Sequence, residues 1–243
     1  MLSMRGACAG YRGGAGVREL DLELRAGEIV ALIGFNGAGK TTLMRLALGM
    51  LPLERGRVSL FGESPERLSA ASRRRIGSLL DAPFAYPELR VHENLRLVRL
   101  LRGAPAGAER RAIEAWGLGP VAGRRARALS LGNRQRLGLA AALLHEPELV
   151  LLDEPGNGLD PLGVLLLREA LRRRRRAGAA VLIGSHHLDE AARLADRVLV
   201  MNEGRIIARL DPAAEDLERA LFRTVLADAR ERGPRPSERG PGV

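Results

Sequence analysis

The sequence predicts an α/β fold with a mostly parallel sheet core, an antiparallel β part at the N-terminus and an inserted α-helical subdomain. Three observations support this prediction. Short apolar runs with the length of buried strands alternate with helical segments. One of these runs leads through a glycine-rich loop directly into a helix. A long stretch of helical pattern, residues 84–145, separates the earlier strands from the later ones.

The first part of the chain contains four predicted strands and one helix. Residues 17–25 alternate apolar and polar side chains, as a half-buried strand does. Residues 29–33 are apolar throughout and predict a buried strand, and a helix over 40–49 follows the glycine loop. Two further apolar runs, 58–61 and 76–80, predict two more strands.

The helical stretch is followed by the second group of strands. Proline and glycine interrupt the stretch near residues 103–105 and 117–120, which divides it into several helices. The run 148–153 is almost entirely apolar and ends in carboxylates, and it predicts another buried strand.

The last third of the chain continues the alternation. Asp160 and the proline after it are typical of the N-cap and first position of a helix, which we expect over 161–176. The apolar runs 180–184 and 197–201 predict two strands, with a helix over 188–195 between them. From residue 230 the sequence is proline, glycine and charge, which predicts a disordered tail over 230–243.

The composition limits the compartment and the partners of the chain. One cysteine, Cys8, allows no internal disulfide and is typical of a reducing compartment. No apolar run approaches the about eighteen residues of a membrane span, and no secretory signal is visible, so we expect a cytoplasmic protein. The net charge of +10 comes from arginine clusters, which we interpret as solvated helix faces. Because only 3% of residues are aromatic, we expect no nucleic-acid partner.

The only lysine of the chain, Lys40, lies in the glycine-rich loop, and every other basic residue except histidine is arginine. The segment Gly34-Phe-Asn-Gly-Ala-Gly-Lys-Thr-Thr42 fits the phosphate-binding pattern G-x-x-x-x-G-K-[ST]. Its backbone N–H groups and the helix N-terminus would hold phosphate oxygens, and a slim ammonium reaches where a guanidinium would not fit. The alternative is a glycine-rich turn before an ordinary helix. The residues that we expect to bind ATP here are Gly34, Asn36, Gly37, Ala38, Gly39, Lys40, Thr41 and Thr42.

Two carboxylates, Asp153 and Glu154, follow the apolar run 148–153 at the strand end. Carboxyl ends of parallel strands share one edge of a sheet, so these groups should lie beside the phosphate-binding loop. We assign Asp153 and the hydroxyl of Thr41 to a Mg²⁺ ion, and Glu154 to the general base that activates water. The alternative is an acidic pair that merely caps a helix.

Three more segments complete a resemblance to a known family. Ala128-Leu-Ser-Leu-Gly-Asn-Arg-Gln-Arg-Leu-Gly-Leu-Ala is similar to the LSGGQ signature of ATP-binding cassette (ABC) transporter ATPases. Leu151-Leu-Asp-Glu-Pro-Gly-Asn-Gly-Leu-Asp-Pro161 resembles their Walker B segment and D-loop, and Gly184-Ser-His186 resembles their switch-histidine segment. The resemblance covers about residues 2–210. It implies a P-loop NTPase fold, with an ABC-type ATP-binding domain over 1–229 and a helical subdomain at about 84–145.

The resemblance implies roles for five residues. Tyr11 would stack on adenine, although a tyrosine at a strand end has a plain structural interpretation too. Ser130 and Gly132 would bind the γ-phosphate of ATP held by another subunit, and Asp160 would contact ATP across the same interface. His186 would bond the γ-phosphate and the attacking water, acting with the catalytic residues Glu154 and Lys40.

The sequence departs from the family pattern at three places. Asp81 stands where the family usually has a glutamine that contacts Mg²⁺ and the membrane partner. We retain Asp81 as a candidate metal ligand, because exporters of the bacitracin- and lantibiotic-resistance type carry a carboxylate there. Leu131 and Asn133 replace a glycine and a glutamine of the signature, and Gly156 replaces a common threonine. None of these changes removes a group needed for hydrolysis.

The resemblance also implies partners. Two ATPase subunits, as a homodimer or a paired heterodimer, would sandwich two ATP molecules, and a separate transmembrane permease would dock near Asp81 and residues 84–101. The subunit would then be peripheral on the cytoplasmic face of the membrane. We expect export of a drug, peptide antibiotic or similar amphiphile. The alternatives are an ABC importer, a soluble ABC ATPase acting on nucleic acid or ribosomes, and a regulator that binds ATP without turnover.

Overall fold

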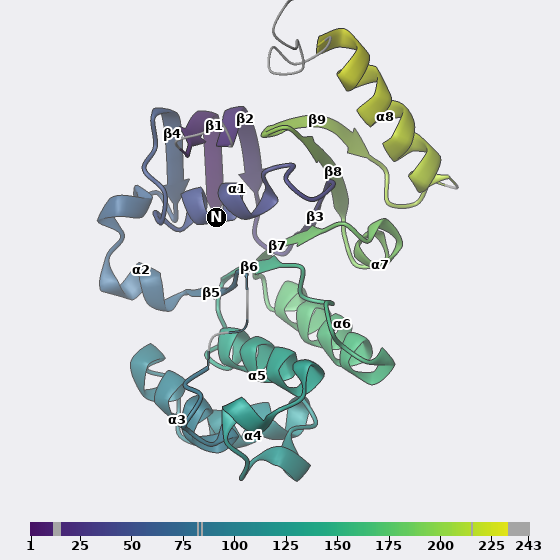
Figure 1. Cartoon of the computed structure of the whole chain (residues 1–243). Helices are drawn as coiled ribbons and strands as arrows, with labels where there is room; N and C mark the ends of the chain where they lie inside the picture. Colours follow the sequence, from purple (N-terminus) through teal and green to yellow (C-terminus); the bar gives the residue numbers. More distant parts are fainter. Residues whose placement is uncertain (12–15, 82, 84, 215, 233–243) are drawn as a thin grey trace, which may run out of the picture.

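The computed structural model describes residues 1–11, 16–81, 83, 85–214 and 216–232 (Figure 1). These residues form the predicted α/β architecture, with two sheets and helices packed around them. No helix within the described ranges is long and apolar enough to cross a membrane.

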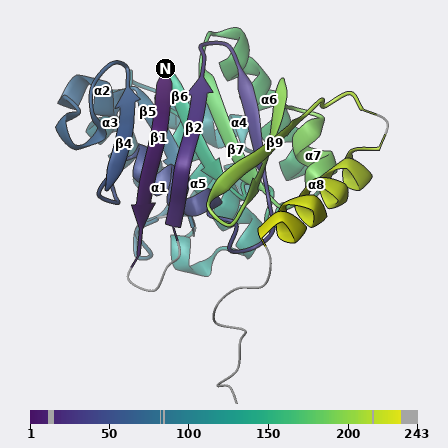
Figure 2. The ribbon, with the colours of Figure 1, turned by 90° about the horizontal axis from the view of Figure 1, so that it is seen from above.

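The smaller sheet is antiparallel and lies at the N-terminal end of the chain. Its strands, in the order β2-β1-β4, are Gly16–Leu24, Leu2–Gly10 and Arg55–Leu60. Figure 2 shows these strands side by side. Strands β2 and β4 confirm two predicted strands. Strand β1 had no predicted bounds, because glycine and alanine weaken its alternating pattern.

The larger sheet has six strands in the order β5-β6-β7-β3-β8-β9. Neighbours from β5 to β8 are parallel, and β9 is antiparallel to β8. The mostly parallel core is therefore confirmed, and its apolar runs suit strands that are covered on both faces. The strands are β3 Ile29–Ile33, β5 Ile76–Leu79, β6 Leu149–Asp153, β7 Ala180–Ser185, β8 Arg197–Asn202 and β9 Arg205–Leu210.

Buried residues form clusters on both faces of the six-stranded sheet. One cluster joins it to the smaller sheet and to helix α1 (Lys40–Ala47). A second joins it to the helical region, where Trp116 is 3% exposed. The sheet therefore holds α1 on one face and the helical region on the other, and its edge between them carries the candidate site.

The helical region lies between β5 and β6 in sequence. Its breaks match the predicted ones, because α3 ends before the first and α4 before the second. The described helices of this region are α3 Val91–Arg102, α4 Ala108–Ala115, η2 Gly119–Val121, η3 Ala126–Ala128 and α5 Leu131–Leu143. Two shorter helices, η1 Pro65–Arg67 and α2 Ala70–Arg74, precede β5.

Helix α6 (Pro161–Arg176) confirms its prediction, and the Asp160 side chain accepts the predicted capping bond from the backbone N–H of Gly163 at 2.8 Å. Helix α7 (Leu188–Ala192) is three residues shorter than predicted. Helix α8 (Leu217–Arg232) corrects the predicted start of the disordered tail, since residues 230–232 are helical. Alanine, arginine and glutamate are strong helix formers, and only the glycine and proline that follow oppose a helix. Residues 233–243 of the predicted tail lie outside the described ranges.

Candidate functional site

The glycine-rich loop joins β3 to α1 and wraps around a hollow. Gly37 and Gly39 have φ of 84° and 107°, in the left-handed region that favours glycine. A Cβ on Gly34 would lie 2.3 Å from the carbonyl oxygen of Met201. The hollow has a volume of 220 Å³. It is lined by Gly16, Asn36, Gly37, Ala38, Gly39, Lys40, Thr41, Thr42, Asp153 and Glu154.

Lys40 is held inside this loop, with only 6% of its surface exposed. Its Nζ atom donates to the carbonyl oxygen of Gly34 at 2.6 Å and to that of Phe35 at 3.4 Å. The same atom lies 3.5 Å from Oε1 of Glu154. The ammonium is thus fixed over the hollow by loop carbonyls and a carboxylate, as a buried charge requires.

Asp153 is the last residue of β6 and is 6% exposed. Its Oδ2 atom accepts a hydrogen bond from the hydroxyl of Thr41, and its Oδ1 atom finds no hydrogen-bond partner among the described residues. Burial raises the pKa of Asp153 above its ordinary value, and the charges of Glu154 and Asp81 raise it further. A buried carboxylate oxygen without a partner, beside a hydroxyl, is the donor set that Mg²⁺ prefers, so these residues fit the ion.

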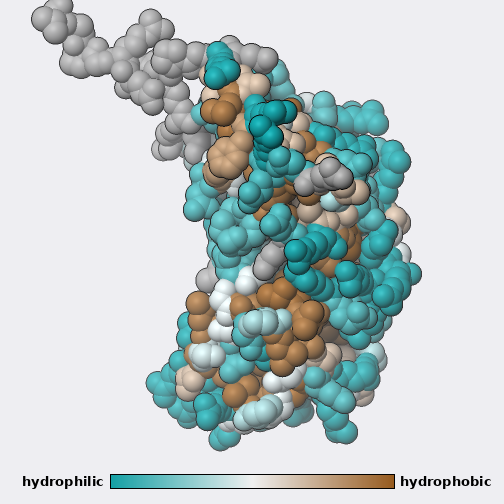
Figure 3. Space-filling view, turned by 90° about the vertical axis from the view of Figure 1, so that its right-hand side faces the viewer, coloured by the Kyte–Doolittle hydropathy of each residue, from teal (hydrophilic) through white to brown (hydrophobic). Residues whose placement is uncertain are grey.

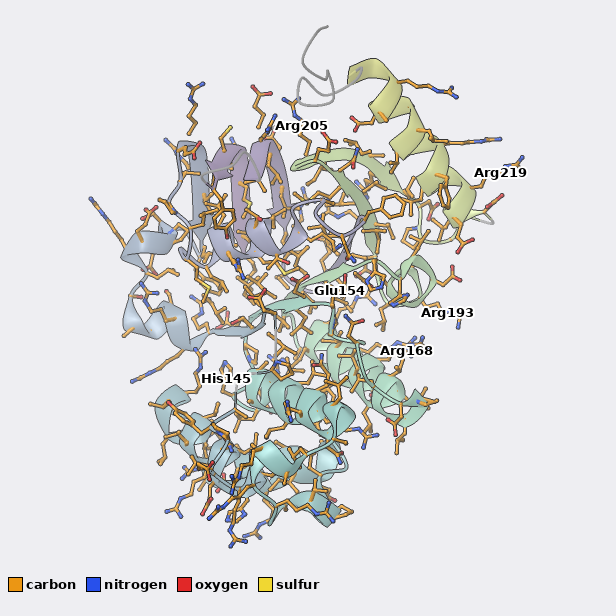
Figure 4. All side chains as sticks on the ribbon, viewed as in Figure 1. His145, Glu154, Arg168, Arg193, Arg205 and Arg219 are labelled. Carbon is orange, nitrogen blue, oxygen red and sulfur yellow. The ribbon has the colours of Figure 1, made fainter. Side chains whose placement is uncertain are left out.

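Glu154 connects the lysine to the candidate histidine. Its backbone has φ of 48°, and its N–H donates to the carbonyl oxygen of Gly184 at 2.8 Å. Its Oε2 atom lies 2.9 Å from Nδ1 of His186. Figure 4 shows Glu154 near the centre of the molecule, above α6. Lys40 begins α1, whereas Glu154 and His186 follow β6 and β7, and the three side chains form a continuous chain of charged and polar groups.

Tyr11 and Asp81 meet at a residue that the sequence analysis did not identify. The guanidinium of Arg45, on α1, donates from Nη1 to the hydroxyl oxygen of Tyr11 at 3.1 Å and from Nη2 to Oδ2 of Asp81 at 2.7 Å. Asp81 is not among the residues that line the hollow at Lys40. The only feature of the sequence that could have identified Arg45 is its position on the same helix as Lys40, five residues later.

Ser130, Gly132 and Asp160 belong to a different part of the surface. Ser130 caps α5, accepting from the backbone N–H of Asn133 at 3.3 Å. Asp160 caps α6 and pairs with the guanidinium of Arg136, which lowers the pKa of the aspartate. Ser130, Gly132 and Asp160 do not line the hollow at Lys40 in the described part of the chain.

Exposed leucines accompany this second group. Figure 3 shows the face that carries α6 and α8, with apolar side chains gathered on its lower half. The exposed leucines of α5 and α6 are Leu131, Leu162 and Leu165, at 64%, 54% and 59% exposure. Apolar patches of this kind mark surfaces that another molecule covers.

A separate groove of 380 Å³ opens beside β5, between α3 and α5. Asp81 lies at this groove, and Phe84, a predicted part of it, lies outside the described residues. The groove is mostly apolar, and its lining includes Met50, Leu79, Leu97, Val98 and Leu101 together with the polar side chains of Ser78, Asp81, Tyr86, Asn94 and Arg102.

Comparison with known proteins gives consistent matches. A family model described as ABC transporter matches residues 17–157, which is more than half of the chain. The lantibiotic transport ATP-binding protein SrtF of Streptococcus pyogenes is 34% identical over 215 residues, covering 88% of this chain and 93% of that protein. The bacitracin transport ATP-binding protein BcrA of Enterococcus faecalis is 38% identical over 198 residues, covering 80% of this chain and 64% of that protein.

The fold has a close counterpart among solved structures. A structure described as the ATP-binding subunit of an ABC transporter superposes with a TM-score of 0.81 at 29% identity. The alignment covers 92% of this chain and 94% of that one. The likeness therefore extends over both sheets and the helical region.

Proposed function

This chain belongs to the ABC transporter family as one of its ATP-binding, ATP-hydrolysing subunits, and on that premise we propose that it powers export of a drug, peptide antibiotic or similar amphiphile. The export path would lie in a separate membrane subunit. The relatives named for lantibiotic and bacitracin transport support this choice of cargo class. The observation that carries the ATPase part of the proposal is the chain of Lys40, Glu154 and His186, of which the first two line the hollow.

The hollow binds the triphosphate of ATP. Loop N–H groups and the N-terminus of α1 face the phosphate oxygens, and the Lys40 ammonium exchanges loop carbonyls for the β- and γ-phosphates. Thr41 and Asp153 would hold Mg²⁺, which neutralises phosphate charge when bound. The unpartnered Oδ1 atom of Asp153 supports this assignment. The metal role of Asp81 stays a prediction.

Glu154 acts as the general base. Its Oε2 atom, already paired with His186, accepts a proton from the water that attacks the γ-phosphorus, while the bond to the β-phosphate oxygen breaks. His186, at the surface beside Glu154, orients that water and the γ-phosphate. Lys40 stabilises the charge that develops on the transferred group.

Hydrolysis needs a second copy or a closely related subunit. Ser130, Gly132 and Asp160 lie away from the hollow of their own chain, so we propose that they serve the ATP of the other subunit in a head-to-tail dimer. The exposed Leu131 and Leu162 would be covered in that dimer. Two copies of this chain would form a homodimer, and this chain with a related ATPase subunit made in the same cell would form a paired heterodimer.

The groove beside β5 is the proposed docking site of the membrane subunit. Its apolar lining suits a short helix of the permease, with Asp81 and Arg102 available at its rim. Docking would place this subunit on the cytoplasmic face of the membrane, with no membrane contact of its own. No nucleic acid takes part in this scheme.

The proposal is tested with the Glu154→Gln variant. The purified variant should bind ATP and form a stable dimer while hydrolysis falls about 10²- to 10⁴-fold, since only the base is lost. In cells, the wild-type chain made together with its membrane subunit should confer resistance to a peptide antibiotic, and the variant should not. Normal hydrolysis by Glu154→Gln contradicts the assignment of the base. Transport that requires an extracytoplasmic binding protein contradicts export.

A further inference from the structure

Arg45 links two residues that are far apart in the sequence. Tyr11 follows β1 and Asp81 follows β5, and both contact the same guanidinium on α1, at 3.1 and 2.7 Å. Each contact uses a different nitrogen atom of the guanidinium, so the two hydrogen bonds are present at the same time. The three side chains therefore make one hydrogen-bonded row from the Tyr11 loop to the end of β5.

Tyr11 offers an exposed ring in a hollow that adjoins the one at Lys40. It is 41% exposed and lines a hollow of 450 Å³. Gly16 lines both this hollow and the one at Lys40, so the two are neighbours. A ligand whose phosphates lie at Lys40 can therefore extend its flat end toward Tyr11. Arg45, about 7.5 Å along the helix axis from Lys40, is bonded to the hydroxyl end of the ring.

Asp81 pairs with Arg45 and does not line the hollow at Lys40, although its charge acts on Asp153 there. Its carboxylate forms the shorter of the two contacts, and its side chain is 54% exposed. Its backbone has φ of 58°, a left-handed conformation that aspartate and asparagine tolerate better than most residues. The hollow at Lys40 is lined by Thr41 and Asp153, whereas Asp81 lines the apolar groove.

We propose that Arg45 is a positioning residue for the nucleobase, holding the ring of Tyr11 through its hydroxyl, and that Asp81 acts on base binding through Arg45 rather than as a metal ligand. This inference rests on the proposed function, since it takes ATP as the ligand. It assigns a use to the carboxylate at position 81. Because Asp81 also lines the docking groove, a permease segment entering that groove contacts the row that holds the base.

The test separates the base from the phosphates. Binding of Mg²⁺-ATP and of Mg²⁺-tripolyphosphate, which lacks a base, is measured for the wild type and for Asp81→Asn. Asparagine keeps the left-handed backbone and removes the charge. We expect Asp81→Asn to weaken ATP binding about two- to fivefold, the size of an exposed ion pair, with tripolyphosphate binding and the half-saturating Mg²⁺ concentration unchanged.

Tyr11→Phe provides the second arm, because it keeps the ring and loses the hydroxyl. It should weaken ATP binding by a similar factor, and Asp81→Asn combined with Tyr11→Phe should lose no more than either variant alone. Glu23→Gln is the matched control, because it also removes the charge of an exposed carboxylate that pairs with an arginine. Glu23 is 63% exposed and lies 3.2 Å from Arg25. The control variant should bind both ligands as the wild type does.

Two outcomes overturn the inference and leave the proposed function intact. One is a raised Mg²⁺ requirement in Asp81→Asn with both ligands, which assigns Asp81 to the metal. The other is additive losses in the combined variant, which means that Arg45 does not connect the two residues. A wild-type chain that binds neither ATP nor tripolyphosphate instead contradicts the proposed function itself.

Discussion

The phosphate-loop region around Lys40 and the signature region around Ser130 differ in how many of their polar groups find partners within the same chain. Around Lys40, polar groups find partners from the loops that follow β3 and β6, and the lysine itself is buried. Around Ser130, the side chain only caps its own helix, and the next residue, Leu131, is 64% exposed. The first region is preformed around a hollow within one chain, whereas the second leaves its polar groups and a leucine at the surface, as the proposed head-to-tail dimer requires.

The largest effect is expected when the two regions are disabled in separate copies. Lys40→Ala should weaken ATP binding at least about 30-fold, because the ammonium that would pair with the β- and γ-phosphates is lost. Ser130→Asp keeps a good helix cap, but its negative charge would repel the γ-phosphate of ATP held by the other subunit. This variant should therefore bind ATP in its own phosphate loop and fail to support hydrolysis. Mixing the two inactive variants should restore about a quarter of the activity, since half the dimers then hold one intact site.

Steady-state phosphate release by the mixture measures this recovery. A mixture of Lys40→Ala with wild type, at the same total concentration, calibrates subunit exchange. If the two inactive variants exchange subunits and the mixture still shows no hydrolysis, the head-to-tail pairing of Lys40 with Ser130 is wrong.

A smaller effect is expected at Asp153, where one substitution should impair the use of Mg²⁺ and at the same time stabilise the fold. Asp153→Asn should raise the Mg²⁺ concentration for half-maximal ATPase activity at least about tenfold, because a charged metal ligand becomes neutral. The same change should increase the free energy of unfolding of the nucleotide-free chain at pH 7. Burial raises the folded pKa of Asp153, so its charge opposes folding above that pKa, and this penalty disappears as the pH falls through it.

Denaturant unfolding at pH 7 without nucleotide measures the change in stability. A Mg²⁺ titration of ATPase activity measures the change in the Mg²⁺ requirement. Thr42→Ser, a mild change at a residue of the same hollow, serves as the comparison. A variant that is both less stable and unchanged in its Mg²⁺ requirement contradicts the assignment of Asp153.

Outside both regions, a partly buried histidine at the far end of α5 should make the fold sensitive to acid. His145 follows α5, and burial lowers its pKa from 6.5 to about 4. Because the unfolded chain takes up the proton first, the stability from neutral His145 is complete above pH 6.5. It is lost as the pH falls toward 4, by about 3 kcal/mol at about 1.4 kcal/mol per pH unit.

His145→Gln removes this titration and keeps a donor for the carbonyl oxygen of Ile76, which His145 contacts at 3.1 Å. Unfolding free energies of wild type and variant, measured from pH 7 to 4, should converge as the pH falls. A constant difference over this range shows that His145 does not titrate with a lowered pKa.

The preformed region was also the more predictable one. The loop from Gly34 to Thr42 requires glycine at fixed positions, and Asp153 and Glu154 follow a buried strand, so local pattern was enough to find them. The row formed by Tyr11, Arg45 and Asp81 was not found, because it depends on three elements brought together only by the fold.

The missed elements have a similar explanation. Strand β9 and helix α8 lie at the edge of the sheet, where packing against β8 and α7 decides their structure more than their own pattern does. Helix α8 leaves Phe222 and Leu226 more than half exposed, which blurs the apolar stripe that identifies a helix. Local sequence was therefore enough to predict the glycine loop and the carboxylates that lie beside it, whereas tertiary contacts determined the rest.

The solitary lysine has a practical consequence for chemical labelling. Apart from the α-amino group at the start of the chain, Lys40 supplies the only primary amine, so an acylating reagent reports on a single side chain. That amine is already shielded, at 6% exposure, and a bound triphosphate would cover it further. The fraction of Lys40 protected from acylation, followed by peptide mass to separate it from the α-amino group, thus measures the fraction of occupied subunits without any introduced probe.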